Sequence, residues 1–263
     1  MSDNVLMHPQ ETADRARALS AKGLFDREVA EIAAISGIPL RTVREWHAWQ
    51  HRYPAAEGRR ARYCPRCDGV PLDEPAYAYL LGLYLGDGHL TRRHEGGYVL
   101  SIACANAWPG LIEEAKEAAR VVMPLSAVST RQCTGMTEVK SGSGHWLCLF
   151  PQHDSGMKNA RKAELAAWQQ GVVDRYPGDL ARGLFHSDGY RGVNRVRRVL
   201  ADGDHWYAYP RYLFSNKSTD ILGLCGAALD RLGVQWRFAR PDVISVAKRG
   251  AVARLDEFVG PKY

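Results

Sequence analysis

Apolar residues recur at helical spacing in three short stretches between residues 12 and 50. The first stretch starts at a threonine and stops at a glycine, which are common helix-capping residues. The second starts at Asp26, a good N-cap, and stops at Gly37. The third starts at Pro39, which fits the first turn of a helix, and carries Val43 and Trp46 on one face. The pattern therefore predicts three short helices.

The string DREVAEIAAISGIPLRTVREW, which covers the second and third helices, resembles the helix-turn-helix of bacterial regulators and resolvases. Ala30 is small where the two helices would cross, Gly37 permits the tight turn, and Ile38 fills the gap beneath it. The resemblance implies a DNA-binding domain over residues 1–52, and a plain helical hairpin is the alternative. The outward residues of its recognition helix would be Arg41, Thr42, Arg44, Glu45 and His47.

A basic linker, residues 53–71, contains the string Cys64-Pro65-Arg66-Cys67. Six cysteines in a chain without an apolar leader indicate a reducing compartment and free thiols. A Cys-x-x-Cys pair is half of a tetrahedral zinc site, and His47 and His51 would complete a ligand set with Cys64 and Cys67. Structural Zn²⁺ is therefore one hypothesis. A Cys-x-x-Cys turn without metal and a His47 that faces DNA are the alternatives.

Two stretches in the rest of the chain match each other: residues 80–88 read LLGLYLGDG, and residues 180–189 read LARGLFHSDG. The resemblance continues from 101–106 to 212–216, and a helical pattern follows each copy, at 111–122 and 221–232. Each half then has a predicted last strand, 146–150 or 243–247, and a Gly-x-Lys triplet, at 156–158 or 260–262. The order predicts an internal duplication over residues 72–263, with halves at 72–160 and 161–263.

Small residues recur every four positions in both copies. Gly82 and Gly86 share one helix face in the first copy, and Gly183 and Ser187 take the same places in the second. Because small residues at this spacing let two helix backbones approach closely, the two motifs are expected to pack against each other.

An aspartate ends each motif helix, Asp87 in the first copy and Asp188 in the second. The glycine after each, Gly88 or Gly189, is expected to leave the helix in the left-handed conformation. Two parallel helices would bring both carboxylates to the negative ends of two helix dipoles, which is repulsive. A divalent cation with oxygen ligands, such as Mg²⁺, would relieve this repulsion.

The paired motifs resemble the LAGLIDADG (DOD-type) motifs of single-chain homing endonucleases. The resemblance implies an α+β fold made of a duplicated αββαββα unit with pseudo-twofold symmetry, preceded here by the small all-α helix-turn-helix domain. The motif helices would form the interface, and the two sheets would straddle the DNA major groove.

The resemblance also implies a function, site-specific hydrolysis of phosphodiester bonds in double-stranded DNA. Asp87 and Asp188 would be catalytic and would hold Mg²⁺ or Mn²⁺. Lys248, at the end of the last strand, would be a catalytic basic residue near the scissile phosphate, with a surface lysine as the alternative.

Three departures from the family pattern leave a second function open. Pro151 stands in the first half where the second half has Lys248, and motif position six, often Asp, is Leu85 or His186. The fused helix-turn-helix is also unusual for such a nuclease. The alternative function is therefore a DNA-binding transcriptional regulator with weak or no cleavage.

Charge supports DNA as the partner. The 35 Lys and Arg residues exceed the 29 Asp and Glu residues, which gives a net charge of +6. One arginine cluster lies between residues 41 and 67, and a second lies in a stretch, 191–215, that reads as a β-hairpin around an Asp-Gly turn. A solvated basic face is the alternative to DNA binding. The second cluster consists of Arg191, Arg195, Arg197 and Arg198.

The longest strongly apolar run, residues 79–85, is much shorter than the roughly 20 residues that cross a bilayer. The first residues also have no apolar leader core. We therefore expect no membrane association and a cytoplasmic, nucleoid-associated bacterial protein. The internal duplication leads us to expect a monomer with pseudo-twofold symmetry.

Overall fold

The computed structural model describes residues 64–263, with the exception of residues 94–96, 154–160 and 202. The predicted helix-turn-helix and most of the predicted linker lie outside the described residues. So do the expected DNA-binding residues Arg41, Thr42, Arg44 and His47 and the expected zinc ligand His51. Among the described helices, none is both long enough and apolar enough to cross a membrane.

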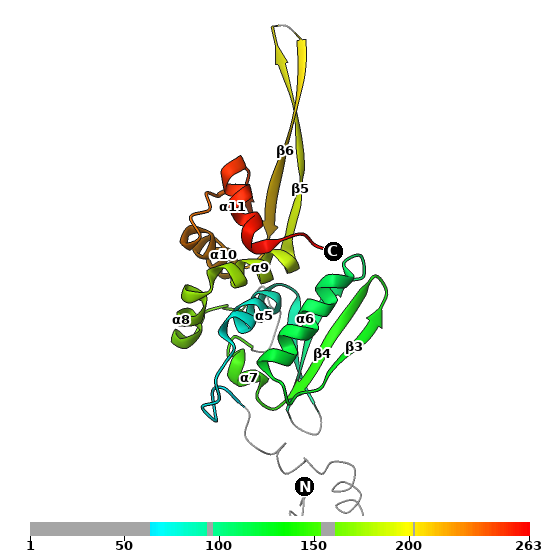
Figure 1. The fold of residues 1–263 in the computed structure, drawn as a ribbon, viewed down its shortest axis with the longest axis vertical. Helices are drawn as coiled ribbons and strands as arrows, with labels where there is room; N and C mark the ends of the chain where they lie inside the picture. The colour runs from blue at the N-terminus through cyan, green and yellow to red at the C-terminus, as the bar shows by residue number, and fades with distance from the viewer. Residues whose placement is uncertain (1–63, 94–96, 154–160, 202) are drawn as a thin grey trace, which may run out of the picture. The chain divides into compact units, whose positions relative to one another are not determined.

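The described residues form two successive α+β halves (Figure 1). The first comprises α5 (Glu74–Asp87), β1 (Gly88–Arg92), β2 (Tyr98–Ala105), α6 (Pro109–Val122), β3 (Val128–Cys133) and β4 (Met136–Ser143). The connection contains α7 (Trp146–Leu149) and α8 (Ala167–Arg175). The second half comprises α9 (Pro177–Asp188), β5 (Gly189–Leu200), β6 (Gly203–Ser215), α10 (Thr219–Arg231), β7 (Arg237–Arg240), β8 (Val243–Val246) and α11 (Arg249–Val259).

The two halves have the same sheet topology. Their antiparallel strands lie in the orders β1-β2-β4-β3 and β5-β6-β8-β7. The turn after the second strand is also repeated: the Asn106 N–H donates to the Gly135 carbonyl and the Asn216 N–H to the Asp242 carbonyl, both at 3.1 Å. The predicted duplicated αββαββα fold is therefore confirmed for the described residues.

The core lies around the two motif helices. The Asp73 side chain caps α5 by accepting from the Ala76 N–H at 2.9 Å, and a proline fits the first turn. Every residue of α5 from Tyr77 to Leu85 is buried, which is typical of a helix inside a core. Helices α5 and α6 cover one face of the first sheet, and α9, α10 and α11 cover one face of the second.

The predicted strand over residues 146–150 is wrong, because this run is the short helix α7. Trp146, Leu149 and Phe150 are fully buried at helical spacing, and the Phe150 N–H donates to the Trp146 carbonyl at 2.9 Å. A short apolar run without alternation fits a buried helix as well as a buried strand. The last strand of the first half is instead β4.

This correction changes the residue that matches Lys248. In the two sheets, β2 and β6 pair with β4 and β8 so that Cys104 faces Thr137 and Phe214 faces Ile244. Thr137 and Ile244 therefore occupy equivalent positions in the two halves. Four residues after each of them lie Ser141 and Lys248, so Ser141, not Pro151, matches Lys248. The sequence match with Pro151 is therefore wrong.

The predicted hairpin is confirmed as β5 and β6, which pair in continuous register from Gly189 to Leu200. Its outer part extends beyond the helices of its half (Figure 1). Apolar residues are exposed along it, among them Val199, which is 76% exposed, and Trp206, which is 69% exposed. Such a surface is more apolar than a solvated arm requires, which favours contact with a partner.

Candidate active site

The motif helices α5 and α9 pack side by side and parallel, with their glycines in direct contact. A Cβ atom added to Gly82 would lie 2.7 Å from the Leu180 carbonyl oxygen and 2.8 Å from the Gly183 Cα. A Cβ on Gly183 would meet the Tyr79 carbonyl oxygen, and one on Gly86 would meet the Ser187 side chain. The predicted close packing of small residues is therefore confirmed.

The glycines that follow the two helices are needed for a reason other than the one expected. Gly88 and Gly189 have φ of −94° and −92°, so both leave their helix with extended backbone and not in the left-handed conformation. A Cβ at Gly88 would lie 2.5 Å from the Tyr84 Cα, and one at Gly189 would lie 2.6 Å from the Phe185 Cα. The first strand of each half folds back so tightly on its motif helix that only glycine fits.

Asp87 and Asp188 end α5 and α9, and they lie at the same end of the helix pair because the helices are parallel. Asp87 lines a hollow of about 90 Å³ together with His186 and Lys262. Asp188 lines a neighbouring hollow of about 350 Å³, where the Asn216 amide donates to its Oδ2 at 2.7 Å. Asn216 is equivalent to Asn106 in the sequence repeat, and both asparagines begin the turn that follows the second strand of their half.

Lys262, which was not among the expected site residues, shares the hollow of Asp87 and interacts electrostatically with both acids. Its ammonium group donates to the Gly189 carbonyl at 2.7 Å and to the Ser187 carbonyl at 3.4 Å. Partial burial lowers the pKa of Lys262, while the charges of both Asp87 and Asp188 act in the opposite direction. Lys262 therefore stabilises the negative end of α9 and lies within electrostatic reach of both carboxylates.

The residues after α11 bring Lys262 to this position by crossing to the first half. The Gly110 N–H donates to the Tyr263 carbonyl at 2.7 Å, and the Tyr263 hydroxyl donates to Glu114 of α6 at 2.8 Å. The Gly-x-Lys triplet at 260–262 was a signal for this residue, but the triplet by itself does not say where the lysine lies. Only the path of the chain places it at the acids.

His186, at motif position six, is part of the helix interface. Its Nε2 lies 2.9 Å from the Val259 carbonyl, and its Nδ1 lies 3.1 Å from the Tyr79 hydroxyl. Burial lowers the pKa of His186 to about 4, although nearby Glu114 raises it. His186 is therefore neutral at neutral pH, and Nε2 carries the proton because a carbonyl can only accept.

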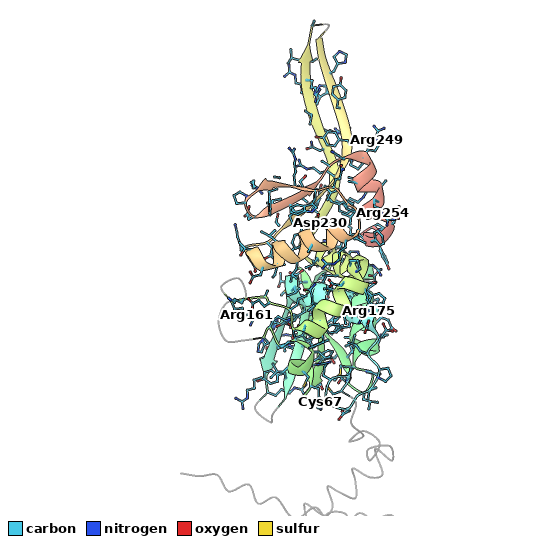
Figure 2. The ribbon with its side chains drawn as sticks, turned by 90° about the vertical axis from the view of Figure 1, so that its left-hand side faces the viewer. Cys67, Arg161, Arg175, Asp230, Arg249 and Arg254 are labelled. Carbon is cyan, nitrogen blue, oxygen red and sulfur yellow. The ribbon has the colours of Figure 1, made fainter. Side chains whose placement is uncertain are left out.

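Lys248 lies in a different hollow from the two acids. It occupies the N-cap position of α11 without a capping hydrogen bond from its side chain, and it lines a cavity of about 1080 Å³. The cavity walls include Tyr209, Trp236, Arg237 and Arg249, and Figure 2 shows Arg249 beside the lower part of the hairpin. The cavity therefore combines the cations Lys248, Arg237 and Arg249 with aromatic rings. Lys248 does not line the hollows of Asp87 and Asp188.

The hairpin arginines are divided between the two faces of their sheet. Strand alternation puts Arg191, Arg195 and Arg197 on the face of Tyr212, which packs on the helices, and Arg198 on the opposite face. Arg191 is held by Asp256 of α11 at 2.7 and 2.8 Å, and Arg197 pairs with Asp204 across the hairpin. The four arginines of the predicted cluster therefore lie in one hairpin but do not form one continuous basic surface.

Comparison with known proteins finds no matching family model and no matching curated protein. Solved structures do match. I-DmoI in complex with DNA and Mn is 15% identical over 72% of this chain and 99% of its own, with a TM-score of 0.47. The meganuclease I-AabMI bound to uncleaved DNA is 11% identical over 69% of this chain and 82% of its own, with a TM-score of 0.44. I-DmoI is described as a homing endonuclease and I-AabMI as a LAGLIDADG meganuclease. Because these identities and TM-scores are low, the assignment of the fold depends on the strand order and helix packing of the described residues themselves.

Proposed function

We propose that this protein is a site-specific endonuclease of double-stranded DNA that requires a divalent metal ion. The observation that carries the proposal is the convergence of Asp87 and Asp188 at the ends of two parallel, closely packed helices. Such a pair of acids costs stability, because each carboxylate repels the other and the negative end of its own helix. A chain that only binds DNA has no use for this arrangement.

The donors at this end of the helix pair suit Mg²⁺ or Mn²⁺. Both acids offer carboxylate oxygens, the ligands that hard divalent cations prefer, and the Asn216 amide orients the Asp188 carboxylate. When bound, the metal ion lowers the pKa of a water molecule and stabilises negative charge on phosphate. Asp87 and Asp188 would hold the ion. Lys262 would offset negative charge beside the ion.

The DNA would lie along the sheet faces opposite to the helices, with the hairpin extending the contact. These faces carry basic side chains in both halves, and the cavity of Lys248 opens among them. Arginines on strands can contact phosphates and base edges in the major groove. The basic residues that strand alternation assigns to these faces are Arg131, Lys140, Arg198, Arg211 and Arg237.

Two further elements of the proposal come from the sequence. The predicted helix-turn-helix of residues 1–52 would add a second DNA contact through Arg41, Thr42, Arg44 and His47. One chain supplies both acids and both sheets, so we also propose that the protein acts as a monomer.

Selection of bound duplexes from a random DNA library, followed by incubation with Mg²⁺ or Mn²⁺, tests the proposal. Wild-type protein should cleave the enriched site, and Asp87→Asn or Asp188→Asn should abolish cleavage but retain DNA binding. Asp174→Asn, at an exposed acid of α8 that pairs with Arg231, is the matched control and should cleave normally.

Intact DNA at saturating protein with either metal ion would refute the endonuclease. Sequence-specific binding without cleavage would support the transcriptional regulator instead. Cleavage of only one strand would indicate that one of the two acids does not take part.

A further inference from the structure

Four potential metal ligands from two distant segments converge at the end of the described domain opposite to the hairpin, where Figure 2 labels Cys67. Cys64 and Cys67 precede α5, whereas His145 and Cys148 belong to the turn after β4 and to α7. Their ligand atoms all lie within 4.8 Å of one another. Neither segment is part of the proposed active site.

The distances in this cluster fit a tetrahedral zinc site. A Zn–S bond of about 2.3 Å places two sulfur ligands of a tetrahedron about 3.8 Å apart. The Cys67 and Cys148 sulfurs lie 3.4 Å apart, and the Cys148 sulfur lies 3.8 Å from His145 Nδ1. All cysteines in the described part of the chain are free thiols, so no disulfide competes for these sulfurs.

Each ligand pair is held by a local turn. The Cys64 carbonyl accepts from the Asp68 N–H at 2.9 Å, and the Asp68 carboxylate accepts from the Cys64 N–H at 2.8 Å. Gly69, with φ of +66°, completes this turn in the left-handed region that favours glycine. In the second pair, the Cys148 N–H donates to the His145 carbonyl at 3.0 Å. Two residues therefore separate the ligands in both pairs, which places each pair on one side of its turn.

We propose that Cys64, Cys67, His145 and Cys148 bind one structural Zn²⁺ ion. Three thiolates and an imidazole are the ligands that zinc prefers, and four protein ligands leave no open position for a reacting water. The ion joins the segment before α5 to the connection between β4 and α7. It thereby fixes the point at which the chain enters the first half.

This ligand set replaces two members of the set that the sequence suggested. Cys64 and Cys67 are common to both, but His145 and Cys148 stand where His47 and His51 were expected. The sequence does contain the second pair as His-x-x-Cys, which begins 78 positions after Cys67. That separation hides the relation, because no local pattern connects the two pairs.

Metal analysis of the full-length protein, purified without chelator, tests the proposal. We expect one Zn²⁺ per chain in the wild type, and loss of the metal in Cys148→Ser and in His145→Ala. Cys133→Ser, at a half-exposed cysteine of β3 outside the cluster, is the matched control and should keep its zinc. A His47→Ala/His51→Ala double variant should keep it as well.

Absence of zinc from the wild type would overturn the proposal, and so would zinc that persists in Cys148→Ser. Loss of zinc in the His47/His51 double variant would assign the metal to the other ligand set. If Cys148→Ser does not fold, Co²⁺ substitution of the wild type decides, because the thiolate-to-cobalt absorption reports three sulfur ligands in tetrahedral geometry. Mass analysis after thiol alkylation without reductant would reveal a Cys67–Cys148 disulfide, which would also refute the zinc site.

Discussion

Replacing Gly82 by alanine should separate the two motif helices. The added Cβ would lie 2.7 Å from the Leu180 carbonyl oxygen, 2.7 Å from the Leu184 nitrogen and 2.8 Å from the Gly183 Cα. These are backbone atoms and cannot rotate away as a side chain can. Since carbon atoms normally pack at about 3.5 Å, the helices must move apart by about 0.7 Å.

Two opposing contributions decide the size of the effect. Overpacking a tight core site costs about 1–3 kcal/mol, and the cost should be near the upper end where rigid backbone is contacted. Alanine is favoured over glycine in a helix by about 1 kcal/mol, which offsets part of this. We therefore expect Gly82→Ala to lower the free energy of unfolding by about 2 kcal/mol.

Gly223→Ala is the matched control, because Gly223 also lies inside a helix, α10, but a Cβ there has no neighbour within 4 Å. This variant should gain about 0.5–1 kcal/mol from helix propensity alone. The two variants should thus differ by about 3 kcal/mol, or by about 1 M in the urea midpoint at a typical m-value. Urea unfolding followed by tryptophan fluorescence measures both.

The reasoning would be refuted if Gly82→Ala stabilised the protein as much as Gly223→Ala does. The same displacement moves Asp87 relative to Asp188, so Gly82→Ala should also slow cleavage at temperatures where the variant remains folded. Full activity in a destabilised variant would mean that the spacing of the two acids is not critical.

The remaining predictions concern pH, the two lysines and the hairpin. The unfolded chain protonates His186 near its ordinary pKa of 6.5, but the folded protein does so only near 4, so stability should fall by up to about 3 kcal/mol between these pH values. His186→Gln should lose less stability than the wild type over that range in urea titrations, and an unchanged slope would contradict the assigned burial of the imidazole. Lys262→Met should reduce the maximal cleavage rate about 10- to 100-fold and lower the Mg²⁺ concentration needed for half-saturation, because one positive charge leaves the acids. Lys248→Met should instead weaken DNA binding with an unchanged Mg²⁺ requirement, whereas loss of cleavage with unchanged DNA binding would support the catalytic role that the sequence resemblance implies for Lys248. Arg198→Ala, on the proposed DNA-facing side of the hairpin, should reduce the salt dependence of DNA affinity by about one unit of slope, measured by fluorescence anisotropy, and Arg191→Ala by less because Arg191 lies on the other face and is already paired with α11. Equal effects would mean that DNA breaks the Arg191 pair.

The duplication could be predicted from the sequence because each of its signals is local. The glycine spacing in residues 80–88 and 180–189, the acid that ends each motif and the alternation of the hairpin all lie within short contiguous stretches. Helix and strand periodicity express which face of one element is buried, and this information is present in a single sequence. From these signals we could predict that α5 and α9 pack closely and that Asp87 and Asp188 lie at the same end of the helix pair.

Local patterns were insufficient where two conformations bury the same residues. The apolar run at 146–150 fits a strand or a helix, and the neighbouring core selected the helix α7. The left-handed conformation expected for Gly88 is wrong, since its φ is −94°, and the glycine is required instead by its close contact with Tyr84. In both cases the decision depends on atoms that other segments bring to the site.

Two groupings were decided by the tertiary structure alone. Lys262 reaches the acids because residues 260–263 cross onto α6, whereas Lys248, which follows a strand in the expected place, lies in a separate cavity. Cys64 and Cys67 meet His145 and Cys148 because α5 and the first sheet fold between them. The physical reason is the same for both: a residue's place in the sequence determines its element and its face. Its distant neighbours depend on how all elements pack together, and no single stretch of the chain contains that information.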